Sequence, residues 1–161
     1  MGAEDNFWGV IDLVTMTAWD FKADDKGMTY PEAMDAIPAE FAEEAELRHQ
    51  ELVEAAADCD DALMEKVLME EEVTVDELKA AIRKGTIACQ IHPVFVGSSY
   101  KNKGVQELLD AVVDYMPSPI DVPAIKGTNP DTGEEDERPS DVKAPFSALA
   151  FKIMTDPFVG K

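Results

Sequence analysis

One helical pattern, between residues 105 and 116, constrains the fold more than any other feature of the sequence. Apolar residues recur there at steps of three and four, which is the period of one face of a helix. They are Val105, Leu108, Leu109, Val112, Val113 and Met116. We therefore expect a helix over residues 105–116 whose apolar stripe faces a core and which ends before Pro117.

A short apolar run precedes this helix. Residues 91–96 read IHPVFV, a nearly uninterrupted run that is typical of a strand covered on both faces. Pro93 cannot donate to a strand ladder, so the register of this strand stays open. Polar residues 97–104 connect the run to the helix. Strand, loop and helix in this order indicate the C-terminal piece of an α/β unit.

The first 90 residues predict a small sheet followed by about three acidic helices, an α+β arrangement. Residues 7–14 and 16–21 are aromatic and β-branched, as strands are, and Thr29-Tyr30 is a short third strand closed by Pro31. Helices are expected over residues 39–57 and 61–68. A third helix begins after Thr74, which forms a capping-box sequence with Glu77, and Gly85 either ends this helix or only weakens it. The inner face of the first helix carries Phe41, Ala45, His49, Leu52 and Ala56.

The C-terminal part of the sequence contains a loop-like segment followed by a strand-like one. Residues 127–140 read GTNPDTGEEDERPS, a loop or linker by composition. Residues 145–155 then alternate between polar and apolar, as a strand does. Because this strand begins so near the last residue, we expect the chain to be an internal piece of a longer protein.

The charge of the chain restricts the partners that it can bind. The 161 residues include 34 acidic and 14 basic ones, which gives a formal net charge of −20 and a pI near 4.2. Such a chain repels polyanions, so direct binding of nucleic acid or of an anionic membrane is not expected. A charged partner should instead present a basic surface. The length allows one domain, or one domain plus a fragment.

Several kinds of reactive site are missing from the sequence. Cys59 and Cys89 are too few for a disulfide scaffold, which predicts buried, reduced thiols in a cytoplasmic protein. No phosphate-binding loop, GxGxxG or GxSxG motif occurs. Cys89 and His92 form one C-x-x-H pair without a second pair, so we expect no metal site. We predict no catalytic residues in this chain.

Three parts of the sequence carry a resemblance to a known family. Residues 97–125 read GSSYKNKGVQELLDAVVDYMPSPIDVPAI, and residues 145–161 read PFSALAFKIMTDPFVGK. Residues 2–14 and 37–57 read GAEDNFWGVIDLV and IPAEFAEEAELRHQELVEAAA. In this order the segments resemble bacterial translation elongation factor G: the end of its GTPase domain, the start of its second domain, and its G′ insert.

The resemblance implies a translational GTPase that promotes GTP-dependent ribosomal translocation of tRNA and mRNA, of which this chain is a middle part. Residues 1–90 correspond to the G′ insert and residues 91–125 to the last strand and helix of the GTPase domain. Residues 126–144 correspond to a linker, and residues 145–161 to the truncated start of a β-barrel domain. The phosphate loop, switch regions, magnesium ligands and Asn-Lys-x-Asp motif of the family would precede this chain. The fragment itself would then hold no cofactor, whereas the whole protein would bind GTP or GDP with magnesium.

One nucleotide-contact motif of the family has a counterpart here. The family's last guanine motif reads Gly-Ser-Ala-Phe, and this chain has Gly97-Ser98-Ser99-Tyr100 at that place. The resemblance implies that this loop directs backbone N–H groups at the guanine carbonyl oxygen. Taken alone, the four residues indicate only an ordinary strand-to-helix loop. Lys101 and Lys103 are expected to be solvated.

The acidic helices allow two interpretations. Residues 31–72 contain 15 acids and two bases, Arg48 and Lys66. The surplus can simply keep an exposed face soluble. The resemblance implies instead that this face meets the ribosomal stalk protein, whose helices carry lysines, and complementary charge would speed that encounter. The candidate contact residues are Glu43, Glu44, Glu46, Glu51 and Glu54.

Two alternatives to elongation factor G stay open. One is the same region of a related translational GTPase of the ribosome-protection or release type. The other is a free-standing acidic protein-interaction module. The sequence that precedes this chain in its gene distinguishes them, since a phosphate loop and an Asn-Lys-x-Asp motif there would indicate a GTPase.

Overall fold

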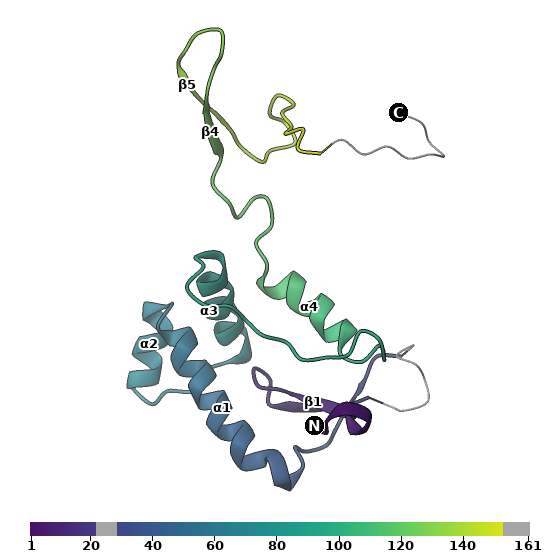
Figure 1. Cartoon of the computed structure of the whole chain (residues 1–161). Coiled ribbons are helices and arrows are strands. Elements are labelled where there is room, and N and C mark those ends of the chain that lie inside the picture. Colours follow the sequence, from purple (N-terminus) through teal and green to yellow (C-terminus); the bar gives the residue numbers. More distant parts are fainter. Residues whose placement is uncertain (22–28, 153–161) are drawn as a thin grey trace, which may run out of the picture. The chain divides into compact units, whose positions relative to one another are not determined.

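The computed structural model describes residues 1–21 and 29–152 and divides the chain into two compact units, Met1–Pro117 and Ser118–Lys161. The first unit contains a three-stranded antiparallel sheet and four α-helices, and the second contains a two-stranded sheet (Figure 1). The α+β fold class expected from the sequence is confirmed. No helix in the described ranges has the length and apolar character that crossing a bilayer requires.

The sheet of the first unit has the strand order β1-β2-β3. A 3-10 turn, Glu4–Asn6, precedes β1 (Gly9–Asp12), which pairs with β2 (Thr17–Asp20) so that Val10 faces Trp19. The third strand, β3 (Glu32–Ala33), pairs with β2 through Trp19 and Ala33. The prediction of a third strand at Thr29-Tyr30 is therefore wrong. Pro31 precedes the strand rather than closing it, a position that proline tolerates because no ladder N–H is needed there.

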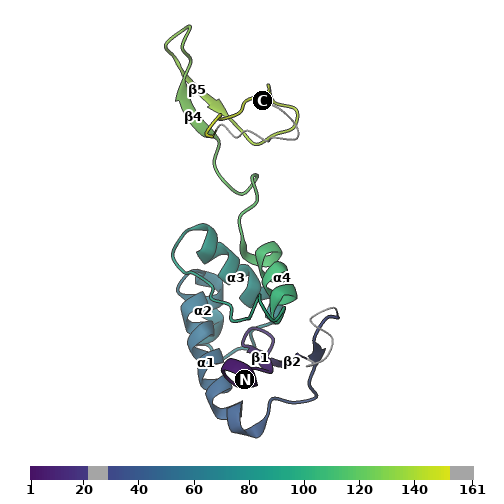
Figure 2. The ribbon, with the colours of Figure 1, turned by 45° about the vertical axis from the view of Figure 1, so that its right-hand side comes forward.

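Three helices follow the sheet, and local sequence signals predict the bounds of the first two and the start of the third. Helix α1 covers Ala39–Ala57, α2 covers Asp61–Leu68 and α3 covers Val75–Ile87. They pack against one another, and Figures 1 and 2 show them as a group beside the β1–β2 hairpin. On α1, His49 Nδ1 donates to the Leu13 carbonyl at 2.6 Å, which ties the helix to the β1–β2 turn. His49 thus lies on the inner face, as its spacing predicts.

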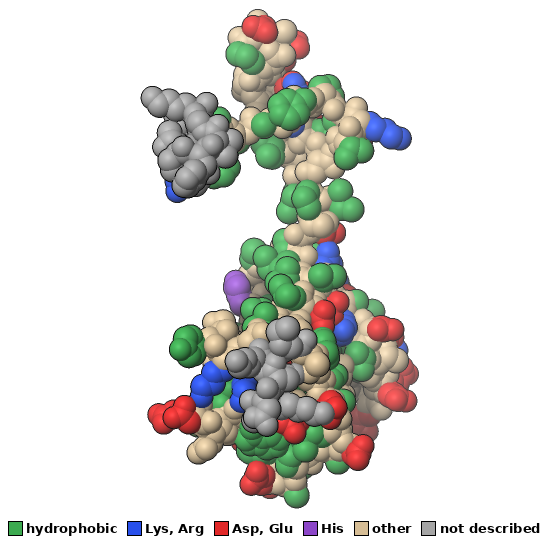
Figure 3. All heavy atoms as spheres, turned by 90° about the vertical axis from the view of Figure 1, so that its right-hand side faces the viewer, with side chains coloured by type: hydrophobic (Ala, Val, Ile, Leu, Met, Phe, Trp, Pro, Cys, Tyr) green, Lys and Arg blue, Asp and Glu red, His purple; other side chains and the backbone are tan. Residues whose placement is uncertain are grey.

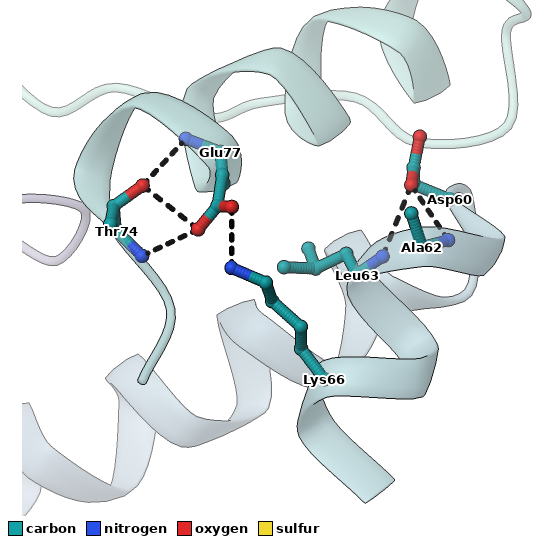
Figure 4. Close-up of polar contacts among 6 residues, drawn as sticks. All are labelled: Asp60, Ala62, Leu63, Lys66, Thr74 and Glu77. Carbon is teal, nitrogen blue, oxygen red and sulfur yellow. Dashed lines mark hydrogen bonds and ion pairs between the residues drawn. The ribbon is translucent and has the colours of Figure 1, made fainter. Parts of the chain in front are cut away.

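The starts of α2 and α3 are capped by side chains (Figure 4). The Asp60 carboxylate accepts from the N–H groups of Ala62 and Leu63 at 3.0 and 3.1 Å. Thr74 Oγ1 accepts from Glu77 N, and the Glu77 carboxylate accepts from Thr74 N at 3.0 Å, which completes the predicted capping box. These bonds satisfy helix N–H groups that have no partner within the helix. Gly85 lies inside α3 and does not end it.

The core of the first unit lies among the helices. Its buried residues are Ala56, Ala57, Leu63, Leu78, Ala81, Ile82, Ala111 and Tyr115. The last two belong to α4 (Val105–Tyr115), which packs against α3. Two cross-links hold this contact: Lys79 Nζ lies 2.7 Å from Asp114 Oδ2, and Arg83 donates to the carbonyls of Asp114 and Met116 at the end of α4.

The expected apolar stripe of α4 does not face this core. Leu109, Val113 and Met116 are 61%, 77% and 54% exposed, and Leu108 and Val112 are exposed as well. The prediction that the stripe packs inward is wrong for this chain, since the helix contacts α3 through Ala111 and Tyr115 instead. Hydrophobic side chains reach the surface of the first unit on the face that Figure 3 presents.

The segment before α4 also differs from expectation. Residues 91–96 form no strand, and the nearby bridge joins Ser98 to Lys103 within one turn. Val94, Phe95 and Val96 are exposed. A strand needs a neighbour that satisfies its N–H and C=O groups. No other strand in the described residues pairs with this segment.

The second unit contains a hairpin where a loop was expected. Strand β4 (Ile125–Thr128) pairs antiparallel with β5 (Glu135–Arg138), and Gly133 takes φ 72° in the turn between them. The predicted loop over residues 127–140 is thus confirmed only at the turn. The predicted strand over residues 145–155 is absent from residues 145–152, and residues 153–161 lie outside the described part.

Candidate functional site

The predicted guanine-contact loop forms a tight turn between residues 91–96 and α4. Ser98 N donates to Lys103 O at 2.8 Å, and Lys103 N donates to Ser98 O at 2.9 Å. Gly97 lies so close to the returning chain that an added Cβ would be 2.8 Å from Lys103 O. Gly104 takes φ 77° and leads directly into α4. The two glycines therefore allow the turn to close on itself.

The middle of this turn presents backbone donors. The described residues include no hydrogen bond donated by the N–H of Ser99 or of Tyr100. Both residues are exposed, and the Tyr100 side chain is 98% exposed. The N–H of Ser98 is already paired, whereas the N–H groups of Ser99 and Tyr100 can donate to a ligand.

Two lysines that were expected to be solvated hold the turn in place. Lys101 Nζ donates to Glu4 O at 3.2 Å and lies 3.0 Å from Asp5 Oδ1. Lys103 Nζ donates to Phe7 O at 2.6 Å and lies 5.9 Å from the centre of its ring. The partners are more than 90 positions away in the sequence, so no local pattern indicates them. The two lysines therefore join the turn to the N-terminal segment.

The five candidate glutamates of α1 are all exposed, but they divide into two groups. Arg48 Nη1 lies 2.8 Å from Glu51 Oε2, and Arg48 Nε lies 3.7 Å from Glu44 Oε1. The hydrogen bond with Glu51, and then the charges of Glu51 and Glu44, raise the pKa of Arg48.

The second group consists of Glu43, Glu46 and Glu54. No ion pair of these three occurs in the part of the chain that the structure describes. Helical spacing places them on one face of α1, opposite the inner face that carries Ala45 and Ala56. We call this unpaired group, Glu43, Glu46 and Glu54, the acidic face of α1.

The remaining reactive side chains form no metal centre in residues 1–21 and 29–152, where no group of three or more potential ligands converges. Cys89 and His92 are exposed, and Cys59 is half-buried. The prediction of two buried thiols is therefore wrong. Cys89 stands just after α3 with φ 57°, in the turn that leads away from the helix.

Comparison with known proteins yields a structural relationship. No family model matches the chain. The crystal structure of ttk003000868 from Thermus thermophilus superposes on it with a TM-score of 0.64 and 25% sequence identity. The superposition covers 77% of this chain and 18% of the Thermus chain. This chain thus spans less than a fifth of the length of that protein, and the two share a fold over the matched part.

Proposed function

We propose that this chain is an internal part of a translational GTPase that resembles elongation factor G and promotes GTP-dependent translocation on the ribosome. The observation that carries the proposal is the turn at residues 97–104. It follows the apolar residues 91–96, it leaves the N–H groups of Ser99 and Tyr100 without partners among the described residues, and α4 begins directly after it. The resemblance of the same residues to a guanine-contact motif gives these donors a role.

The exposed apolar surface supports the same proposal. Apolar residues of 94–96 and of α4 lie open in this chain, although an apolar surface of this kind is normally covered. In a GTPase domain, the other strands of the sheet would pair with residues 91–96 and cover α4. The similarity to one part of the longer Thermus chain supports such a place within a larger protein.

The proposal divides the chemistry between this chain and the rest of the protein. GTP or GDP and magnesium would be held mainly by a phosphate loop and magnesium ligands outside these residues. Residues 97–100 would add backbone hydrogen bonds to the base. Because backbone donors do not depend on the side chain, Ser99 in place of the family's alanine is compatible with this role. A partner with lysine-bearing helices, such as the ribosomal stalk protein, would meet the acidic face of α1.

The test compares the protein encoded by the whole gene with the 161-residue chain. We expect the whole protein to bind a fluorescent GDP analogue and to hydrolyse GTP faster when ribosomes are added. The isolated chain should do neither, because its sequence contains no phosphate loop. Hydrolysis without translocation would favour a ribosome-protection or release-type factor. No guanine-nucleotide binding by the whole protein would favour the free-standing acidic module and refute the proposal.

A variant pair tests the turn itself. Ser99→Pro removes one backbone donor, whereas Ser99→Ala changes only the side chain. One hydrogen bond contributes about 0.5–1.5 kcal/mol, so Ser99→Pro should weaken GDP binding to the whole protein by about 2- to 10-fold. Ser99→Ala should leave the affinity unchanged. Equal affinities for GDP in both variants would show that the turn is not part of the nucleotide site.

A further inference from the structure

The first unit contains a cavity of about 920 Å³ that is separate from the turn tip and from the acidic face of α1. Its walls come from the β1–β2 hairpin, Tyr30, α1, α3, residues 90–96 and α4. The volume lies within the range of about 300–1,000 Å³ that is usual for small-molecule sites.

Aromatic rings form much of the cavity wall. Trp19 and Tyr30 meet edge to face with their ring centres 5.7 Å apart, and Phe95 and Tyr115 stack at 6.1 Å. All four rings line the cavity, together with aliphatic side chains such as Ile82. Aromatic faces attract cations as well as apolar groups. The wall is therefore suited to an apolar ligand that carries positive charge.

The charged groups of the cavity are mostly satisfied. Asp110 accepts a hydrogen bond from the Tyr30 hydroxyl at 2.8 Å, and Asp114 pairs with Lys79 at 2.7 Å. Asp12 accepts from Val14 N and from the Thr15 hydroxyl. The cavity thus holds several carboxylates and a single ammonium group among its described lining residues, and that ammonium is already paired.

Glu107 is the exception. It lines the cavity from α4, its two carboxylate oxygens each expose less than 1 Å², and neither has a hydrogen-bond partner among the described residues. Burial raises the pKa of Glu107, the residue's own backbone N–H opposes part of this rise, and the charge of Asp110 adds a smaller increase. A buried carboxylate without a partner is costly, and a bound cation that donates hydrogen bonds would remove this cost.

From this arrangement we propose that the cavity binds a small aliphatic amine. Its ammonium group pairs with Glu107, and its apolar stem lies along the aromatic wall. An anion is disfavoured, since the lining carboxylates outnumber the single lysine and the whole chain carries −20 charges. None of the guanine-motif residues Gly97 to Tyr100 lines the cavity, whereas Val94, Phe95 and Val96 do, so the test uses the 161-residue chain, in which these three residues lie open.

The test is a calorimetric titration of the 161-residue chain with 1-hexylamine at pH 7. We expect saturable binding that Glu107→Gln weakens about tenfold or more. Glu43→Gln on the acidic face removes the same charge outside the cavity and should have no effect. The neutral analogue 1-hexanol should bind more weakly, with equal affinity for the wild type and the Glu107→Gln variant. Equal binding of hexylamine by these two proteins, or no saturable binding, would overturn the proposal.

Three further measurements help to interpret the titration. Glu107→Gln removes a buried, unpaired charge and should melt at the same temperature as the wild type or higher. A second variant, Val94→Lys, places a competing ammonium at a lining position that is 85% exposed, and it should also weaken hexylamine binding. An oligolysine peptide should not displace hexylamine. Displacement that depends on Glu107 would show that a partner's lysine side chain, rather than a free amine, occupies the cavity.

Discussion

Gly85 departs from the general preference for alanine over glycine inside helices. It lies inside α3, where alanine is normally about 1 kcal/mol more favourable than glycine. Here an added Cβ would lie 2.6 Å from Cys59 Sγ and 2.8 Å from Ile91 Cγ1. The missing side chain lets the α1–α2 connection and the segment after α3 approach the helix closely. Close packing therefore explains why glycine, rather than alanine, occupies this helix position.

We predict that Gly85→Ala destabilises the chain by about 1–3 kcal/mol, as overpacking of a core does. The measurement is urea unfolding followed by circular dichroism. Cys59→Ala alone should have a small effect, and the double variant should recover part of the loss because it removes the nearest atom. A stability gain from Gly85→Ala alone would contradict the close packing around this position.

For the turn at residues 97–104, the sequence predicts where the residues lie in the fold better than it predicts their contacts. Gly97 to Tyr100 are expected in a loop between an apolar segment and a helix, and they lie there. The anchoring of that loop by Lys101 and Lys103 depends on groups near residue 5, so adjacent sequence carries no sign of it. The cavity and the buried Glu107 could not be predicted either, because their surroundings are assembled from segments spread between residues 10 and 115.

At the scale of elements, local signals explain which predictions succeed. The bounds of α1 and α2 agree with the sequence expectation, since periodicity and caps such as Asp60 act within a few residues. Strands depend on distant partners. The strand at 91–96 is missing because no neighbour among the described residues pairs with it, and β4–β5 was not predicted because its polar residues have low strand propensity.

The capping box of α3 predicts a pH dependence. Lys66, and then the Thr74 backbone and hydroxyl, lower the pKa of Glu77 from 4.5 to about 2 (Figure 4). Because the folded pKa is below the unfolded one, the stabilisation is fully present above about pH 4.5. It is lost as the pH falls towards 2, where the folded carboxylate becomes protonated.

Glu77→Gln should therefore lower the unfolding midpoint at pH 7, and the difference from the wild type should shrink between pH 4.5 and 2. Thermal unfolding at a series of pH values measures this. Glu65→Gln, an exposed glutamate of α2, is the control and should change little. A difference that stays constant over this pH range would argue against the ionised capping contact.

The acidic face of α1 predicts binding that depends on salt. Reversing the charge of Glu43, Glu46 and Glu54 to lysine should weaken binding of a lysine-rich helical partner such as the stalk protein. Exposed pairs contribute only about 0.2–1 kcal/mol each, and salt screens them, so affinity should be modest and should fall at high ionic strength. Titrations at two salt concentrations measure both effects.

The matched control reverses Glu134, Glu135 and Glu137, three exposed glutamates of the second unit, and so changes the net charge equally. If both triple variants lose affinity to the same extent, net charge rather than the acidic face determines binding. If affinity is the same at low and high salt, the contact is not electrostatic.

At the scale of the whole molecule, α4 has two unequal faces. Ala111 and Tyr115 pack into the core of the first unit, whereas the larger apolar stripe stays open. A helix with an exposed apolar stripe is expected where further protein covers it. The proposed GTPase domain would provide this cover, so the two faces should differ in their response to substitution in the isolated chain and in the whole protein.

We predict that Leu109→Ser combined with Val113→Ser changes the unfolding free energy of the isolated chain by no more than about 0.5 kcal/mol per site, as exposed positions do. Tyr115→Ala should cost about 3–5 kcal/mol in the same urea titration. In the whole protein, each stripe residue would be buried and would contribute about 1.5–3 kcal/mol, so the same serine pair should become strongly destabilising there. A large loss already in the isolated chain would mean that the stripe, rather than Tyr115, is the packed face. A negligible loss in both proteins would mean that nothing covers α4, and would remove the main structural support for a surrounding GTPase domain.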